Sequence, residues 1–228
     1  KMYFDPYKLG AGGLYNDSVG DVGNGNEHGV STARDGKTIV GFRGIDFGKI
    51  GSDSITLPIF ELGGVETPIG IWDGKPGEKE SRLLITAVYQ KASIWNTYQE
   101  ETYLLPERLK GIHDLYFELH QKLHLKGFVF RKYPKAFECL YANESEAIYG
   151  DQMRVTEKGV MDIGNNVTLE FSDMDFGSDG TDKICICGRT QNEKNTIHIR
   201  FFDGEKENRQ NIEFPQEEEF TMQEFKKE

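Results

Sequence analysis

The chain has 228 residues, enough for one large domain or two small ones, and 37% hydrophobic residues with 26 glycines is a globular composition. Its 27 Lys and Arg against 38 Asp and Glu give a net charge of −11, which argues against nucleic acid as a partner because the phosphate backbone is itself anionic. No apolar run is long enough to cross a bilayer and the first residues, KMYFDPYKLG, lack the pattern of a signal peptide, so we expect no membrane partner.

Short runs of β-branched and aromatic residues, separated by Gly, Asp, Asn and Pro clusters, predict many short strands. In chain order these runs are residues 38–42, 54–60, 68–72, 83–88, 167–171, 183–187 and 196–202. Ile197, Ile199 and Phe201 alternate with polar residues, which is typical of a strand with one buried face. Cys185 and Cys187 share one face of their run, and we expect them to be small core residues.

Residues 107–126 fit two different structures. Their apolar residues are spaced as on one face of a helix: Leu109, Ile112, Leu115, Leu119 and Leu123. The same segment also alternates apolar and polar residues between Leu115 and Leu119, as a half-buried strand does. Periodicity by itself favours the helix.

An internal repeat divides the chain. Asp46-Phe47-Gly48 recurs 129 residues later as Asp175-Phe176-Gly177, and IGIWDG at residues 69–74 is answered by IRFFDG at residues 199–204. We therefore predict two tandem modules, residues 1–132 and 133–228. The second is an incomplete copy, because it has no counterpart of residues 111–130 at its C-terminal end.

Four motifs follow one another along the first module: IDFG at residues 45–48, IWNTY at 94–98, GIHDLYFEL at 111–119 and GFVF at 127–130. In this order they resemble carbohydrate-binding module family 6 over about residues 9–130. The resemblance implies an antiparallel β-sandwich of jelly-roll, galactose-binding-like topology, in which residues 111–119 form a strand. The second module is similar to accessory modules of bacterial family 2 glycoside hydrolases of the β-galactosidase type.

The resemblance also implies a sugar site at loops on one edge of the sandwich, where aromatic rings face the C–H surface of a pyranose and polar groups meet its hydroxyls. Trp95 matches the family's platform tryptophan, and Tyr15 lies in the first loop, where the family places a second ring opposite it. Asn96 and Tyr98 are candidates for contacts at the rim. His124 stands where the family has a sugar-binding Asn, and imidazole can donate or accept a hydrogen bond.

Metal and catalytic sites are not favoured. Many members of the family hold a structural calcium ion with an early Glu and a late Asp; here the late position is Lys126, whose charge would repel Ca²⁺, so we expect no cofactor in the first module. His120 and His124 have a spacing that suits zinc on a helix but not on a strand. Asp46 and Asp175 recur as turn-forming residues would, whereas a glycosidase needs two carboxylates across a cleft.

The sequence therefore favours non-catalytic modules that hold a parent glycoside hydrolase on an oligo- or polysaccharide, raising a weak affinity by proximity. The alternative is a structural or docking module that packs on the catalytic domain of the parent enzyme and binds no sugar. Exposure of Trp95 and Tyr15 separates the two, since two buried rings would favour docking. An extracellular or cell-surface location is favoured over a cytoplasmic one, although three cysteines leave the redox compartment open.

Overall fold

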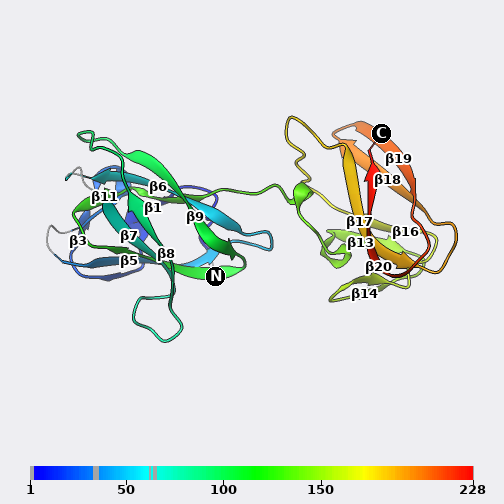
Figure 1. The fold of residues 1–228 in the computed structure, drawn as a ribbon, viewed down its shortest axis with the longest axis horizontal. Coiled ribbons are helices and arrows are strands. Elements are labelled where there is room, and N and C mark those ends of the chain that lie inside the picture. Colours follow the sequence, from blue (N-terminus) through cyan, green and yellow to red (C-terminus); the bar gives the residue numbers. More distant parts are fainter. Residues whose placement is uncertain (1–2, 33–35, 62, 64–65, 228) are drawn as a thin grey trace. The chain divides into compact units, whose positions relative to one another are not determined.

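A computed structural model describes residues 3–32, 36–61, 63 and 66–227 of the chain. Contacts divide the chain into two compact units, Lys1–Tyr133 (unit 1) and Pro134–Glu228 (unit 2), and most described residues lie in antiparallel strands (Figure 1). The all-β fold class predicted from the sequence is confirmed. Helical structure in the described part consists of four 3₁₀ turns: Gly12–Leu14, Asn26–His28, Lys135–Phe137 and Ala142–Glu144. None of the helices among the described residues is long and apolar enough to span a membrane.

Unit 1 contains a five-stranded sheet with β10 at its centre. Its strands, in spatial order, are β2 (Asp17–Val19), β5 (Thr38–Asp46), β10 (Ile112–Leu119), β7 (Thr67–Asp73) and β8 (Arg82–Tyr89). In the middle of β10, Phe117 pairs with Val40 on one side and Ile71 on the other. Gly41 on β5 is needed beside this strand, because a Cβ there would lie 2.2 Å from the ring of Tyr116.

The second sheet of unit 1 packs its apolar face against the first. Its strands are β1 (Gly10–Ala11), β12 (Gly127–Phe130), β6 (Ser52–Glu61), β11 (Leu123–Leu125), β4 (Val30–Thr32) and β3 (Val22–Asn24), with β9 (Gln99–Leu109) also paired to β6. Phe128 from β12 meets Phe42 and Phe117 of the first sheet, with ring centroids 4.9 and 5.4 Å apart. These rings form the centre of a buried hydrophobic core, which fixes how the two sheets pack and holds the loops at the edge of unit 1.

The helix favoured by periodicity over residues 107–126 is wrong, and the strand implied by the resemblance is confirmed as β10. Leu115, Phe117 and Leu119 are all fully buried, so the two-residue alternation marks the core face. The helical spacing arose because Leu109 and Leu123 are buried as well, but on β9 and β11, two other strands.

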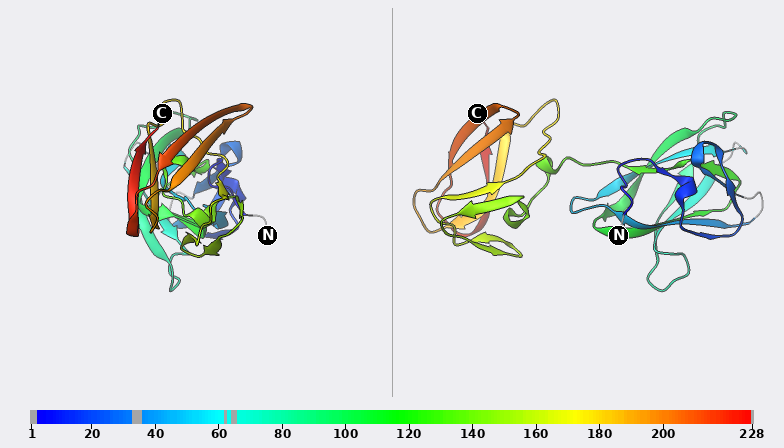
Figure 2. Two further views of the ribbon diagram at one scale, coloured as in Figure 1. Left: turned by 90° about the vertical axis from the view of Figure 1, so that its right-hand side faces the viewer. Right: turned by 180° about the vertical axis from the view of Figure 1, so that it is seen from behind.

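Unit 2 consists of four strand pairs (Figure 2). They are β13 (Ala147–Gly150) with β16 (Val167–Glu170), β14 (Arg154–Thr156) with β15 (Gly159–Met161), β17 (Lys183–Thr190) with β20 (Glu217–Lys226), and β18 (Thr196–Asp203) with β19 (Lys206–Glu213). Of the buried apolar residues among the described positions, only Val160, Ile212 and Phe214 belong to this unit. That unit 2 is a truncated copy of unit 1 stays a prediction.

The two Asp-Phe-Gly tripeptides form matching turns. The Asp46 carboxylate accepts a hydrogen bond from the N–H of Gly48 at 2.9 Å, and Asp175 accepts one from Gly177 at 2.8 Å. Both glycines have positive φ, 65° and 66°, where a side chain would be strained. The prediction that Asp46 and Asp175 are turn-forming residues is confirmed.

The expectation that Cys185 and Cys187 lie in the core is wrong. They do share one face of β17, but Ile184 and Ile186 take the inner face and both cysteines are exposed, as is Cys139. We therefore expect all three thiols to react with a thiol reagent in the folded protein as fast as in urea. Thiol titration with and without denaturant measures this, and a thiol that reacts only in urea would contradict it.

Candidate functional site

Trp95 is the most exposed large apolar side chain among the described residues, at 82%. It lies in the loop between β8 and β9, and its ring meets Phe60 edge to face, with centroids 6.1 Å apart. Phe60 belongs to β6 and is buried, so the indole stands on the rigid sheet while nearly all of its surface stays in water. An aromatic ring held in this way is typical of a binding surface.

The loop that carries Trp95 is held by polar contacts. Asn96 has a φ of 54°, a left-handed conformation that Asn tolerates better than most residues. Its Oδ1 accepts a hydrogen bond from Nδ2 of Asn26 at 2.7 Å. The hydroxyl of Thr97 donates to the carbonyl of Trp95 at 3.2 Å. The indole is therefore held in place by the turn Asn26–His28 as well as by Phe60.

Tyr98 connects the same turn to the sheet. Its hydroxyl donates to the carbonyl of Asn26 at 2.9 Å, and its ring lies 6.5 Å from that of Phe60. Burial, followed by the charge of Glu27, raises the pKa of Tyr98, so the phenol keeps its proton. The ammonium of Lys126 lies 5.7 Å from the ring centroid and forms an ion pair with Glu27.

His124 on β11 lies on the other side of Phe60, with ring centroids 5.4 Å apart. Its Nδ1 is buried and has no hydrogen-bond partner among the residues that the structure describes. Burial, followed by the charge of Lys122, lowers the pKa of His124, which keeps the imidazole neutral at pH 7. Because Nδ1 is inaccessible to a ligand, a hydrogen bond from His124 to a ligand would have to come from the other ring nitrogen, Nε2.

The structure thus gathers four of the five predicted site residues around Phe60: Trp95, Asn96, Tyr98 and His124. Together with Asn26 and Phe60 we call them the Trp95 cluster. Tyr15 is half-buried and packs against the core, and within the described residues no ring contact or hydrogen bond joins it to Trp95. Asn26 was not predicted, although the polar run Asn26-Glu27-His28 after a glycine-rich stretch was a visible signal.

No group of three or more His, Cys, Asp or Glu side chains in the described part of the chain could hold a metal ion. Lys126, which we expected to repel calcium, pairs with Glu27. That unit 1 binds no calcium stays a prediction.

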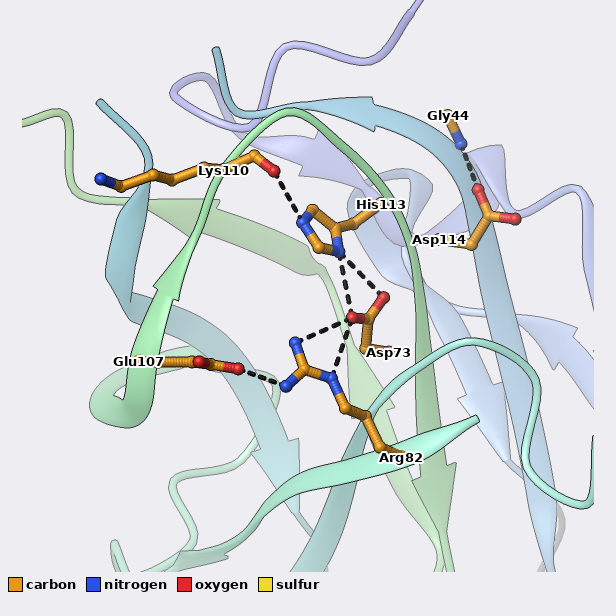
Figure 3. Close-up of polar contacts among 7 residues, drawn as sticks. All are labelled: Gly44, Asp73, Arg82, Glu107, Lys110, His113 and Asp114. Carbon is orange, nitrogen blue, oxygen red and sulfur yellow. Dashed lines mark hydrogen bonds and ion pairs between the residues drawn. The ribbon is translucent and has the colours of Figure 1, made fainter. Parts of the chain in front are cut away.

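The His-Asp pair of the GIHDLYFEL motif belongs to a second polar cluster, at the start of β10 (Figure 3). Nδ1 of His113 lies 3.0 Å from both carboxylate oxygens of Asp73, and Nε2 lies 2.9 Å from the carbonyl of Lys110. Asp114 accepts a hydrogen bond from the N–H of Gly44 at 2.7 Å. These contacts tie β10 to β5 and β7, so the motif is structural here.

Neighbouring charged groups shift the pKa values of His113 and Asp73 in this second cluster. The hydrogen bond to Asp73 raises the pKa of His113 above its usual 6.5, against the opposing effect of burial. Burial would raise the pKa of Asp73, but the hydrogen bonds and charges of His113 and Arg82 outweigh it and hold that pKa below 3.8. Arg82 also pairs with Glu107 on β9.

We expect unit 1 to lose stability as pH rises from about 5 to about 8.5, because only the imidazolium can donate from both nitrogens of His113. A group whose pKa is higher in the folded state than in the unfolded state stabilises the fold at pH values below its unfolded pKa. That contribution is lost as the pH rises above its folded pKa. The lowered pKa of Asp73 acts oppositely, so its contribution is lost in acid. Urea unfolding of the wild type and of His113→Gln at both pH values measures this. If the difference in unfolding free energy between the two proteins does not shrink at the higher pH, the expectation is wrong.

No protein-family model matches the sequence, and no curated protein matches it. Several solved structures are similar to it. CsCBM6-3 from Clostridium stercorarium, in complex with cellobiose, is 19% identical, with 58% of this chain and 98% of that chain covered and a TM-score of 0.49. A family 6 carbohydrate-binding module from Clostridium cellulolyticum in complex with xylose is 19% identical, covering 57% and 100%, with a TM-score of 0.45. A β-1,3-glucan binding CBM6 from Bacillus halodurans is 19% identical, covering 57% and 100%, with a TM-score of 0.46.

Proposed function

We propose that unit 1 binds an oligo- or polysaccharide at the Trp95 cluster. The observation that carries the proposal is the indole of Trp95, 82% exposed yet held from beneath by Phe60 and from the side by Asn26 and Asn96. A flat apolar surface of this kind suits the C–H face of a pyranose, and stacking on it needs no rearrangement of the loop.

The polar members of the cluster are suited to sugar hydroxyls. The amides of Asn26 and Asn96 offer donors and acceptors beside the indole, and the neutral imidazole of His124 can take either role. Such groups set which hydroxyls are accepted, because an unpaired hydroxyl buried against the protein would cost desolvation free energy. With one ring of the cluster exposed to stack on a sugar, we expect the affinity for a single sugar chain to be weak.

Weak binding of this kind is useful when the module is linked to another domain. We propose that the chain serves as an accessory, non-catalytic region of a glycoside hydrolase of the β-galactosidase type, holding that enzyme on its glycan. Linkage makes the encounter of the catalytic domain with the glycan intramolecular and raises its local concentration.

Titration of the full chain against galactose-containing, xylan-type and β-glucan oligosaccharides tests the proposal. Intrinsic fluorescence is a suitable signal, because the chain has two tryptophans and Nε1 of the other, Trp72, is buried. We expect saturable quenching or a blue shift with at least one ligand class. If none of the three ligand classes changes the fluorescence or the migration in affinity gels, the proposal is wrong. The alternative, a structural or docking module that binds no sugar, is then favoured.

A further inference from the structure

Units 1 and 2 pair their strands in the same order. In unit 1, β2 pairs with β5, β3 with β4, β6 with β9 and β7 with β8; in unit 2, β13 pairs with β16, β14 with β15, β17 with β20 and β18 with β19. Taken in chain order, β13 to β20 of unit 2 correspond to β2 to β9 of unit 1. Each of the eight strands of unit 2 pairs with the counterpart of its partner in unit 1. Four strands of unit 1 have no counterpart among residues 134–227: β1, β10, β11 and β12. Of these, β10 lies between β5 and β7 and joins them into one sheet, whereas no strand among residues 134–227 lies between β16 and β18.

The elements on either side of this position also match in detail. The Asp-Phe-Gly turns after β5 and β16 share their hydrogen bond and their glycine φ. The strands β7 and β18 each end in Asp-Gly, and both glycines, Gly74 and Gly204, have positive φ, 81° and 59°. The likeness therefore extends to both strands that would flank a counterpart of β10.

In unit 1, the Asp-Phe-Gly turn holds the start of β10. The N–H of Phe47 donates to the carbonyl of Gly111 at 2.8 Å, and the N–H of Gly111 donates to the carbonyl of Gly48 at 2.7 Å. In unit 2, the N–H of Phe176 and the carbonyl of Gly177 have no backbone partner among residues 134–227. The turn that receives a strand in unit 1 is present in unit 2 with these two groups unpaired.

The apolar rows of the two units differ in burial as this missing strand requires. In unit 1, Val40 and Phe42 on β5, with Ile69 and Ile71 on β7, lie beside β10 in the same sheet and are fully buried. Their counterparts in unit 2 are only half-buried: Leu169, Phe171, Ile199 and Phe201. Apolar side chains in a row beside an unpaired strand edge are a site for another strand.

We propose that unit 2 has the strand pairing of β2 to β9 without the central strand β10, and that β16 and β18 together form an acceptor site for one extended strand that runs antiparallel to both. The occupant binds by main-chain hydrogen bonds to the two edges and by alternate side chains, as in other strand-addition complexes. The acceptor site lies wholly within unit 2 and does not depend on sugar binding by unit 1.

The register of unit 1 defines the inner face of the occupant. Phe117 lies between Val40 and Ile71, so the matching residue of the occupant lies between Leu169 and Phe201. Large apolar side chains are needed at this residue and at the residues two before and two after it. A segment of seven or eight residues with this alternation fills the site, the length of β10 itself.

The outer face adds a charge preference. Glu118 of β10 pairs with Ile39 and Gly70, and the counterpart of Gly70 is Arg200, whose side chain is exposed on β18 and pairs with Glu207 at 3.0 Å. An acidic residue of the occupant at the position of Glu118 lies beside this guanidinium. A basic residue there would add to the positive charge, so we expect acidic side chains on the outer face.

Strand order indicates the source of the occupant. In unit 1, β10 follows β9 after Lys110 and Gly111, and β20 takes the place of β9 in unit 2. The strand β10 of unit 1 cannot itself fill the acceptor site, because it is already paired on both edges, with β5 and β7. We therefore assign the occupant to polypeptide that follows β20, entering between β16 and β18 as β10 enters between β5 and β7.

Hydrogen exchange on an extended chain tests the proposal. A copy of residues 110–130, which contain the strand that fills the same position in unit 1, is appended after Glu228. The matched control carries the same extension with its copies of Leu115, Phe117 and Leu119 replaced by serine. We expect amide exchange in β16 and β18 to slow by at least about tenfold with the first extension and to be unchanged with the second. Exchange in β5 and β7 of unit 1 should be the same in all three proteins.

Equal exchange in β16 and β18 with and without the apolar extension would overturn the proposal. So would slow exchange of those strands in the chain of 228 residues, because their edges would then already be covered. A synthetic peptide of residues 111–120 added to the 228-residue chain distinguishes the sources. Protection by the peptide but not by the extension would overturn the assignment to polypeptide after β20 and make the donor a separate chain.

Discussion

Replacing Trp95 by alanine should remove measurable glycan binding and leave stability within about 0.5 kcal/mol of the wild type. The ring is 82% exposed and its only ring contact is with Phe60 in the described chain, so its removal uncovers little core. In a complex the same ring would be covered by sugar. Losing it would remove roughly 1.5–3 kcal/mol of burial free energy, about ten- to a hundredfold in Kd, which takes a weak interaction below detection.

Two other aromatic residues serve as controls for Trp95→Ala. Tyr141 in unit 2 is also exposed, at 59%, so Tyr141→Ala should keep both glycan binding and stability. Tyr15 packs against the core, so Tyr15→Ala should lower the melting temperature, and its effect on binding tells whether the second ring of the resemblance takes part. Unchanged glycan binding by Trp95→Ala, or a large loss of stability, would contradict the site.

Much of the fold could be predicted from the sequence because a strand with one buried face carries its own signal. Ile197, Ile199 and Phe201 alternate as β18 requires, and the run predicted at residues 167–171 contains all of β16. The helix expected over residues 107–126 shows the limit of this signal. Three separate strands can each bury a leucine, and their spacing along the chain can imitate one helical face.

The site was less predictable, for a physical reason. Whether an aromatic side chain in a loop points into the core or into water depends on the contacts of that loop, here between Asn96 and Asn26, which are seventy residues apart. Cys185 and Cys187 show the same limit, since alternation shows that two residues share a face but not which face is buried. Trp95 could be found only because its neighbours matched a motif, and Asn26 had no such match.

Replacing Phe117 by alanine should destabilise unit 1 by roughly 3–5 kcal/mol, whereas Phe201→Ala should cost unit 2 less than about half of that. Phe117 is fully buried and meets Phe42 and Phe128, with ring centroids 5.9 and 5.4 Å apart, so alanine leaves a cavity at the middle of the sandwich. Phe201 is the counterpart of Ile71 and lies beside the acceptor site. It is only half-buried, and its ring centroid lies 6.0 Å from that of Phe176. Removing it opens no closed cavity, because the ring is only half-buried, and the group over it is the flexible ammonium of Lys227, 5.3 Å from the ring centroid.

The two units can be followed separately in urea, because both tryptophans, Trp72 and Trp95, lie in unit 1. Tryptophan fluorescence should show a much lower midpoint for Phe117→Ala and an unchanged one for Phe201→Ala, while hydrogen exchange in β17 and β20 follows unit 2. Adding the apolar extension should raise the cost of Phe201→Ala toward that of Phe117→Ala, since the ring would then be enclosed. An equally large cost for Phe201→Ala in the chain of 228 residues would mean that unit 2 has a closed core and needs no further strand.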